Sequence, residues 1–205
     1  MNTGPSLNIP LKGIFRAGLL TTMALAWPVS VAGQALRVQP RSPRVRPELI
    51  CVLCSLTVSA TPASVSFVLV KGGTATASAP IVITTTLNGV SALSSLKLYG
   101  YFNSPTAALT DGRTTPDNIP SSAVFGQMTT GVPTSYTAFT QSGPIGTAGA
   151  SLLLFSTTSL LSIGCIPIVA SCRTDSLNLQ ITLPSLPNLP AGSYHGTVLF
   201  EAQAL

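Results

Sequence analysis

Residues 175–205, DSLNLQITLPSLPNLPAGSYHGTVLFEAQAL, decide the fold. From 176 to 183, polar and apolar residues alternate without a break. Because successive side chains of a strand point to opposite faces, this alternation predicts a half-buried strand. A proline-rich connection follows, and a second alternating run over 193–204 carries Tyr194 on its apolar face. We therefore predict two β-strands that contribute to one core.

The composition supports the same fold class. Charged residues make up 7% of the chain and apolar residues 45%, whereas soluble domains usually carry roughly 25% charged residues. Low net charge with ordinary hydrophobicity argues against intrinsic disorder. The content of Ser, Thr, Val and Leu, with 17 Gly and 17 Pro, favours short strands and tight turns. The composition therefore indicates an all-β globular domain.

The N-terminus has the layout of a secretory signal. Two basic residues precede an apolar run over 17–31, which ends in small residues. This order predicts a signal peptide over 1–35, with cleavage after Ala32 or Ala35. A membrane anchor is the competing interpretation, and Pro28 within the run argues against it. We expect a secreted protein, extracellular or periplasmic, with no integral membrane span after cleavage.

The segment 36–50 differs from the rest of the chain because it combines four arginines with three prolines. It is typical of an extended Pro/Arg-rich linker between the signal and the domain. A basic arm that touches an anionic polymer, lipid or nucleic acid is the alternative. Four charges give only weak, sequence-blind attraction, so we expect no nucleic-acid partner. From residue 47 onward there are four basic and five acidic residues, so the positive charge belongs to this segment.

Residues 51–205 predict a single β-sandwich domain. Alternation bounded by Gly, Pro and Asn turn signals gives nine short strand candidates. This number of strands is typical of an antiparallel sandwich of two sheets. We expect an immunoglobulin-like Greek key, with a jelly roll as the alternative. The candidates are 52–60, 64–70, 80–87, 95–102, 123–128, 135–140, 150–156, 176–183 and 193–204.

The segment 189–198, Leu-Pro-Ala-Gly-Ser-Tyr-His-Gly-Thr-Val, resembles the end of bacterial secreted immunoglobulin-like domains. It resembles more loosely the fimbrial-type group that includes the spore coat U domain. The resemblance implies a structural tyrosine corner at Gly192 and Tyr194, with the Tyr194 hydroxyl bonded back to the backbone. Fimbrial subunits that complete a neighbour's sheet need an N-terminal extension of alternating apolar residues. The arginines and prolines of 36–50 depart from that pattern.

The four cysteines of an exported chain are disulfide candidates, and three connectivities are open. Cys165 and Cys172 bracket six residues and could cross-link the base of a loop. Cys51 and Cys54 are three apart and would point to opposite faces of a regular strand, so pairing them needs a turn, or each must reach the other pair. A redox Cys-x-x-Cys motif works at a helix N-terminus, whereas here it precedes a predicted strand. Structural cystines are therefore favoured over redox chemistry.

The sequence is poor in groups for catalysis. His195 is the single imidazole, and Glu201 on the same strand face lies roughly 20 Å away along a strand. No Gly-x-Ser-x-Gly elbow presents a serine nucleophile. The acidic loop 111–118 could offer oxygens to Ca²⁺, but its spacing favours a plain turn, and the cysteine pairs lack histidine partners for a metal. We predict no enzyme activity and no catalytic, cofactor or metal site.

Tyr99 and Tyr101 are the candidate glycan contacts, since they alternate on one face of a predicted strand. If exposed, the two rings form a small stacking surface for sugars. If buried, they belong to the core. The only Trp, Trp27, lies within the predicted signal peptide, which favours the core.

Together these observations predict a secreted, non-catalytic structural or adhesive β-sandwich of the bacterial cell envelope or exterior. Its charge-poor surface suits self-assembly or contact with other envelope components, because little net charge keeps copies apart. A monomeric carbohydrate-binding module, with polysaccharide as its partner, is the alternative function.

Overall fold

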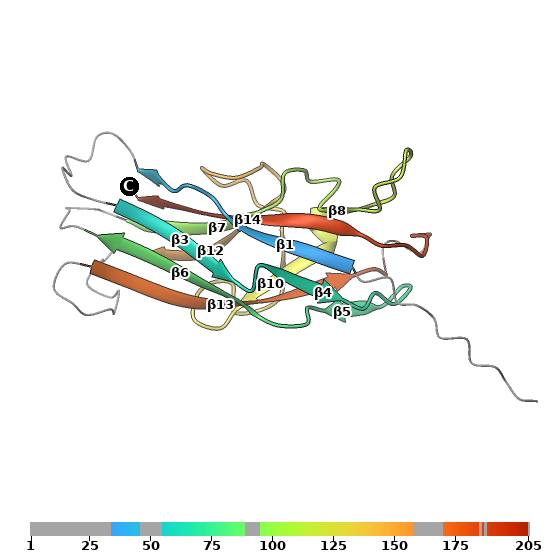
Figure 1. Ribbon diagram of the computed structural model, residues 1–205, viewed down its shortest axis with the longest axis horizontal. Coiled ribbons are helices and arrows are strands. Elements are labelled where there is room, and N and C mark those ends of the chain that lie inside the picture. Colours follow the sequence, from blue (N-terminus) through green and yellow to red (C-terminus); the bar gives the residue numbers. More distant parts are fainter. Residues whose placement is uncertain are drawn as a thin grey trace, which may run out of the picture. The chain divides into compact units, whose positions relative to one another are not determined.

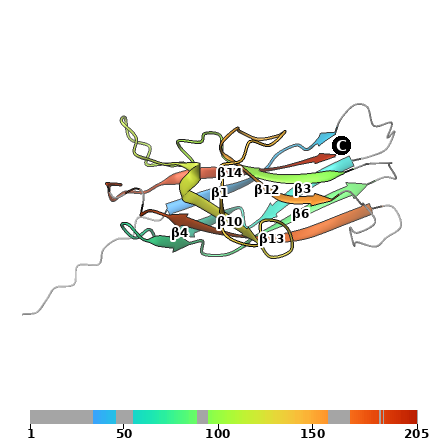
Figure 2. The ribbon, with the colours of Figure 1, turned by 180° about the vertical axis from the view of Figure 1, so that it is seen from behind.

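A computed structural model of the protein describes residues 34–45, 55–88, 95–157, 170–184, 186 and 188–204. All of these belong to the second of the two compact units of the chain, Val31–Leu205. They form two packed β-sheets (Figure 1, and from behind in Figure 2). The single helical element of the described part is the 3₁₀ turn η1 (Ser121–Ala123). The predicted all-β, two-sheet sandwich is confirmed.

The first sheet, sheet A, has the strand order β12-β7-β14-β1-β4. The short strand β2 also pairs with β14, and β8 pairs with both β14 and β9. β1 and β2 run parallel to β14, whereas the other pairs of this sheet are antiparallel. The strands are β1 (Gln34–Pro40), β2 (Arg44–Val45), β4 (Ser64–Phe67), β7 (Leu96–Tyr101), β8 (Leu109–Thr110), β9 (Asn118–Ile119), β12 (Ser151–Thr157) and β14 (His195–Ala204).

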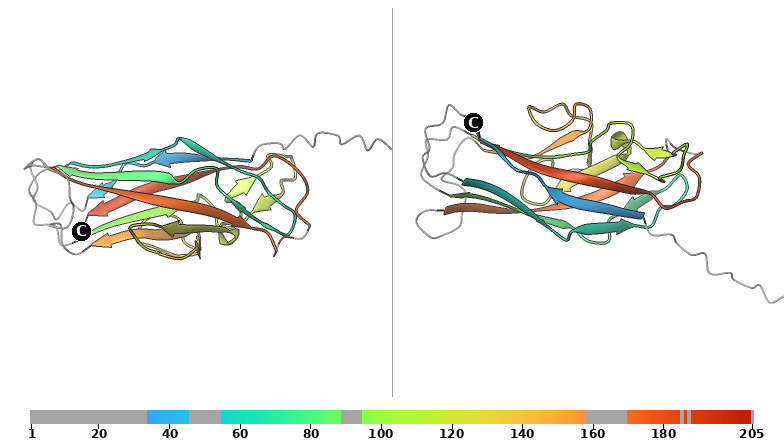
Figure 3. Two further views of the ribbon diagram at one scale, coloured as in Figure 1. Left: turned by 90° about the horizontal axis from the view of Figure 1, so that it is seen from below. Right: turned by 45° about the horizontal axis from the view of Figure 1, so that its top comes forward.

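The second sheet, sheet B, has the order β11-β10-β13-β6-β3, with β5 paired to β13. All its pairs are antiparallel. The long strands of both sheets run along a similar direction in every view (Figure 3), as in aligned sandwiches. The strands are β3 (Ser55–Thr61), β5 (Thr74–Thr76), β6 (Ile81–Asn88), β10 (Val124–Met128), β11 (Thr137–Ala138) and β13 (Ala170–Thr182).

This order is typical of an immunoglobulin-like Greek key. In that fold the first, second, fifth and fourth strands form one sheet, as β3, β6, β13 and β10 do here. The third and sixth strands lie side by side in the other sheet, as β7 and β14 do, and the seventh strand follows them. In this protein β1, which precedes all the other described strands, lies beside β14 in the place of the seventh strand.

The position of β1 corrects the prediction of a linker over 36–50. Residues 36–40 belong to a strand that pairs with β14 on one side and β4 on the other. Leu36 and Val38 point into the core, with 0% and 7% of their surface exposed, while Arg37 between them is exposed. The predicted start of the domain at Cys51 was therefore wrong: the sandwich already includes Gln34. Residues 46–50 lie outside the described residues.

The core lies between the sheets and joins the alternating apolar residues of both. From 177 to 183 of the deciding stretch, the apolar residues are buried and the intervening ones half-buried, as the alternation predicts. Among the described residues, no helix has the length and hydropathy needed to cross a membrane. The predicted signal peptide lies outside the described residues as far as position 33, and so does the candidate cleavage position Ala32.

Candidate functional site

The tyrosine corner forms at the turn that leads into β14. The hydroxyl of Tyr194 donates a hydrogen bond to the carbonyl of Pro190 at 2.9 Å, and the side chain is buried. This is the backbone contact that the resemblance implied. The carbonyl of Gly192 accepts a hydrogen bond from the Gln34 side chain at 3.2 Å. The corner therefore anchors the start of β1 as well as the start of β14.

The candidate glycan residues Tyr99 and Tyr101 are buried, with 5% and 7% of their surface exposed. They lie outside the core cluster, on the outer face of sheet A, where Gly143 and Gly146 pack against them. A Cβ on Gly143 would lie 2.5 Å from the Tyr99 ring, and one on Gly146 would lie 2.8 Å from the Tyr101 ring. This close approach leaves too little exposed surface on these two rings for a sugar to stack on them.

The same outer face of sheet A carries a buried carboxylate beside Tyr101. Glu201 is 3% exposed and accepts a hydrogen bond from the Tyr101 hydroxyl at 2.9 Å. Its other oxygen pairs with Nε of Arg44 at 2.7 Å. Burial, followed by the hydrogen bond and negative charge of Glu201, raises the pKa of Tyr101 from 10.0 to about 12. The cluster ties β2, at the N-terminal side, to β7 and β14.

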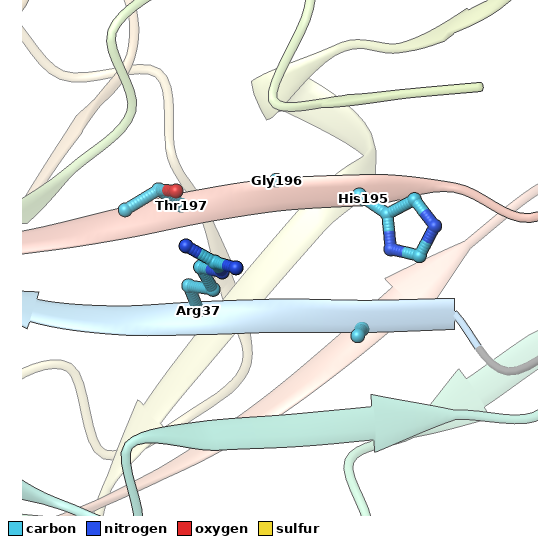
Figure 4. Close-up of a pocket in the computed structure, with 5 residues that line it drawn as sticks. Arg37, His195, Gly196 and Thr197 are labelled. Carbon is cyan, nitrogen blue, oxygen red and sulfur yellow. The ribbon is translucent and has the colours of Figure 1, made fainter. Parts of the chain in front are cut away.

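A surface pocket of about 520 Å³ lies where β1 and β14 run side by side. It is lined by Ala35 and Arg37 of β1 and by His195, Gly196 and Thr197 of β14. Figure 4 shows Arg37 reaching from β1 toward β14, with Thr197 and His195 on either side. Glycine is required at 196, because a Cβ there would lie 2.1 Å from the carbonyl oxygen of Ala108. Because Ala35 and Arg37 form one side of the pocket, it exists only while β1 lies beside β14.

The chemistry of this pocket is that of an anion site. A guanidinium, an imidazole and a hydroxyl can all donate hydrogen bonds to a carboxylate or sulfate. Arg44, Arg113 and Arg173 each form an ion pair with an acidic side chain. Arg37 differs from them, because no described acidic side chain lies within ion-pair distance of it. The His195 side chain is exposed.

The acidic loop over 111–118 is closed by its own residues. The Asp111 side chain accepts hydrogen bonds from the backbone N–H groups of Arg113 and Asp117 at 3.2 and 3.1 Å. Arg113 also pairs with the Asp111 carboxylate at 3.1 Å. Within the described residues, no group of three or more His, Cys, Asp or Glu side chains is placed to hold a metal ion. The arrangement is that of a turn held by an Asp and an Arg.

A second buried carboxylate, that of Asp175, forms an ion pair that sequence reasoning missed and that links the two sheets. Arg173 of β13 pairs with Asp175 at 2.6 Å and lies over the ring of Phe155 of β12, 3.9 Å from its centroid. The Thr130 hydroxyl donates to the same carboxylate at 2.7 Å. The available signal was the position of Asp175, which continues the apolar phase of Leu177 and so places a charge in the inward row.

Of the cysteines, only Cys172 lies within the described residues. It is in β13, opposite Thr86 of β6. Cys51, Cys54 and Cys165 lie outside the described residues, so the disulfides and their connectivity stay predictions.

No protein-family model matches the sequence. A search of curated proteins also found no match. The resemblance to fimbrial-type and spore coat U-like domains therefore rests on residues 189–198 alone and stays a prediction.

Proposed function

We propose that the protein is a secreted, non-catalytic structural subunit of a bacterial cell envelope or its exterior, and that copies assemble by exchanging β1. The observation that supports this proposal is the place of β1. A strand from the N-terminal side fills the position that the last strand takes in an immunoglobulin-like sandwich.

The residues of β1 suit insertion into a groove. Gln34, Leu36 and Val38 are buried, while Arg37 and Gln39 are exposed. The strand forms backbone pairs along both sides, over six residues with β14 and four with β4. A strand with one apolar face and hydrogen bonds on both edges is the unit by which β-augmentation joins chains. Arg37 is the one arginine within β1, and its side chain is exposed, so it does not interrupt the buried face of the strand.

The exchange preserves the contacts of the closed molecule. If β1 of one copy occupies the groove between β14 and β4 of another, each buried residue meets the same neighbours as before. Exchange of an identical element is a low-cost route to assembly for this reason. β1 lies at the outer end of the described chain, and residues 46–54 connect β2 to β3. Only this connection must take a new path.

A variant whose own β1 cannot insert tests whether the groove between β14 and β4 binds a β1 strand supplied from outside. A mature protein with Leu36→Asp and Val38→Asp keeps the groove but carries a strand that cannot fill it, because buried unpaired charges are costly. We expect this variant to bind a fluorescent peptide of residues 34–45, or to refold only when that peptide is present. A peptide with Arg37→Ser should bind equally well, since this side chain points outward, and a peptide with both Asp substitutions should not bind.

The state of the native material gives the second arm. Surface polymer sheared from producing cells should contain the protein at high mass without reducing agent. A protein recovered only as a soluble monomer, together with a groove variant that ignores the peptide, would overturn the proposal.

The pocket at Arg37 favours a second candidate function, the binding of an acidic polysaccharide. A guanidinium without an acidic partner among the described residues, beside an imidazole and a hydroxyl, suits uronate or sulfate groups rather than neutral sugars. Binding of oligogalacturonate, measured by calorimetry, should be lost in Arg37→Gln and kept in the matched variant Arg41→Gln. Equal binding by both variants, or binding of a neutral oligosaccharide, would contradict this function.

A further inference from the structure

The strand β3 forms one edge of sheet B and is unusually open. It pairs with β6 along all seven of its residues, without a bulge, and no described strand follows it in the sheet. Its inward-facing Val58 and Ala60 are only partly buried, although they pack against the core. The sandwich is therefore incompletely closed along this edge.

The other sheet edges of the described part are short or protected. β11, at the edge of sheet B opposite β3, has two residues, and β4, at one edge of sheet A, has four. The edge of β12 is capped by Gln141, whose side chain accepts a hydrogen bond from the Leu153 N–H at 2.8 Å and whose backbone bridges to Ser151. From residue 56 to 61, β3 is the one long edge with no such cover among the described strands.

Nothing in the sequence of β3 guards it against pairing. Natural edge strands carry a charge, a proline or a bulge that prevents association. The residues of β3, Ser-Leu-Thr-Val-Ser-Ala-Thr, include none of these, and the ladder stops only at Pro62, which has no N–H to donate. The neighbouring strand β6 is also free of charged residues.

We propose that β3 pairs with β3 of a second copy, antiparallel, about a two-fold axis through Val58. In this register Val58 faces its own copy, Leu56 faces Ala60, and Thr57 faces Ser59. The apolar residues of the inner face thus meet apolar residues, and hydroxyls on the outer face meet hydroxyls. No like charges are opposed, because the strand has none. The second copy is the occupant that this self-complementary pattern fits.

The affinity of the β3–β3 contact in the native material rests on the proposed assembly through β1. A single pair of seven-residue strands buries less than the roughly 1,000 Å² expected of a stable interface, so two free copies should associate weakly. Copies joined in a row by β1 exchange would present many β3 edges at once, and linked sites bind far more tightly than single ones. The β3 contact then joins one row of copies to the next.

A cysteine at the axis tests the register directly. In the mature protein, Val58→Cys should give a covalent dimer under mild oxidation, because directly opposed residues have the Cα separation that a disulfide needs. Ser66→Cys on the edge strand β4 serves as the matched control and should stay monomeric. Peptide mapping without reduction should show the bond joining position 58 of one copy to position 58 of the other.

A charge on the edge tests the interface independently. Ser59→Lys in the Val58→Cys background should lower the dimer yield about tenfold, because two like charges then enter the pair. Thr84→Lys, on β6 directly beside Ser59, adds the same charge one strand away from the edge and should leave the yield unchanged. A Val58→Cys yield no higher than that of Ser66→Cys, or one that Ser59→Lys leaves unaltered, would overturn the proposal. Both readouts stand whether or not the groove variant binds the β1 peptide, so failure of the assembly proposal is distinguishable.

Discussion

The carboxylate of Glu201 is held by two side chains, one on each oxygen. Its contacts with Tyr101 and Arg44 join three strands. The alternation of 193–204 correctly placed Glu201 on the face opposite Val198 and Phe200. It could not show that Glu201 is buried on that face, because such burial depends on residues distant in the sequence, Tyr101 and Arg44 among them. The burial of Glu201 was therefore not predictable.

The raised pKa of Tyr101 predicts how stability responds to alkali. The folded protein keeps this proton up to a pKa of about 12, above the ordinary value of 10.0. Between these values Tyr101 loses its proton in the unfolded chain first. Its contribution to the free energy of unfolding is therefore complete below pH 10 and is lost as pH rises toward 12. Glu201→Gln should lower the pKa of Tyr101, since it removes a charge and alters the hydrogen bond. Alkaline absorbance titration checks this, and an unchanged midpoint for this tyrosine would contradict it.

The Tyr194 hydroxyl is the second residue-scale test. Tyr194→Phe removes the hydrogen bond to Pro190 and leaves a carbonyl without its partner, so it should cost about 1 kcal/mol of unfolding free energy. Tyr136→Phe changes a ring that is 39% exposed and should have little effect. Urea unfolding of both variants compares the two. Equal midpoints would mean that the corner hydrogen bond contributes nothing.

Among the strands, the sequence predicted those that alternate between clear turn signals and missed β1 and several strands of two or three residues. Each of the nine candidate strands overlaps a strand of the structure. The two-residue strands β2, β8 and β9 are too short to show any period. β1 has the alternation, with Leu36 and Val38 inward, but Pro40 and the neighbouring arginines favoured a linker. Its pairing with β14, which lies at the other end of the chain, is a tertiary contact that local pattern cannot reveal.

The structure of β1 leads to a prediction about the signal cleavage site. Cleavage after Ala35 would remove Gln34, whose side chain bonds to Gly192 and to the Leu69 N–H. It would also remove the backbone bond from Ala35 to Tyr194. Cleavage after Ala32 keeps both. We expect the secreted protein to begin at Gly33, which N-terminal sequencing or intact mass would show, whereas a chain beginning at Leu36 would exclude a complete β1.

The whole molecule should assemble by contacts that salt hardly affects. The β1 contacts are backbone hydrogen bonds and apolar burial, and the proposed β3–β3 pair would be of the same kind. Arg44–Glu201 is the described ion pair that joins the N-terminal strands to the sheet. Since salt near 1 M shortens the screening length to about 3 Å, the assembled mass in sedimentation should be equal at low and high NaCl. Oligogalacturonate binding at Arg37 should weaken over the same range. An assembly that dissociates in salt would point to the arginines instead.

The fold class of the whole molecule was predictable, because composition and alternation both depend on burial averaged over many residues. The parallel run of β1 beside β14 was not, and it has a mechanical consequence. Both strands begin at the same end of their pair, so Gln34 and Ala204 lie at opposite ends of it. A pull between the two ends of the domain loads all the hydrogen bonds of this pair at once, in shear, and cannot unzip them one by one.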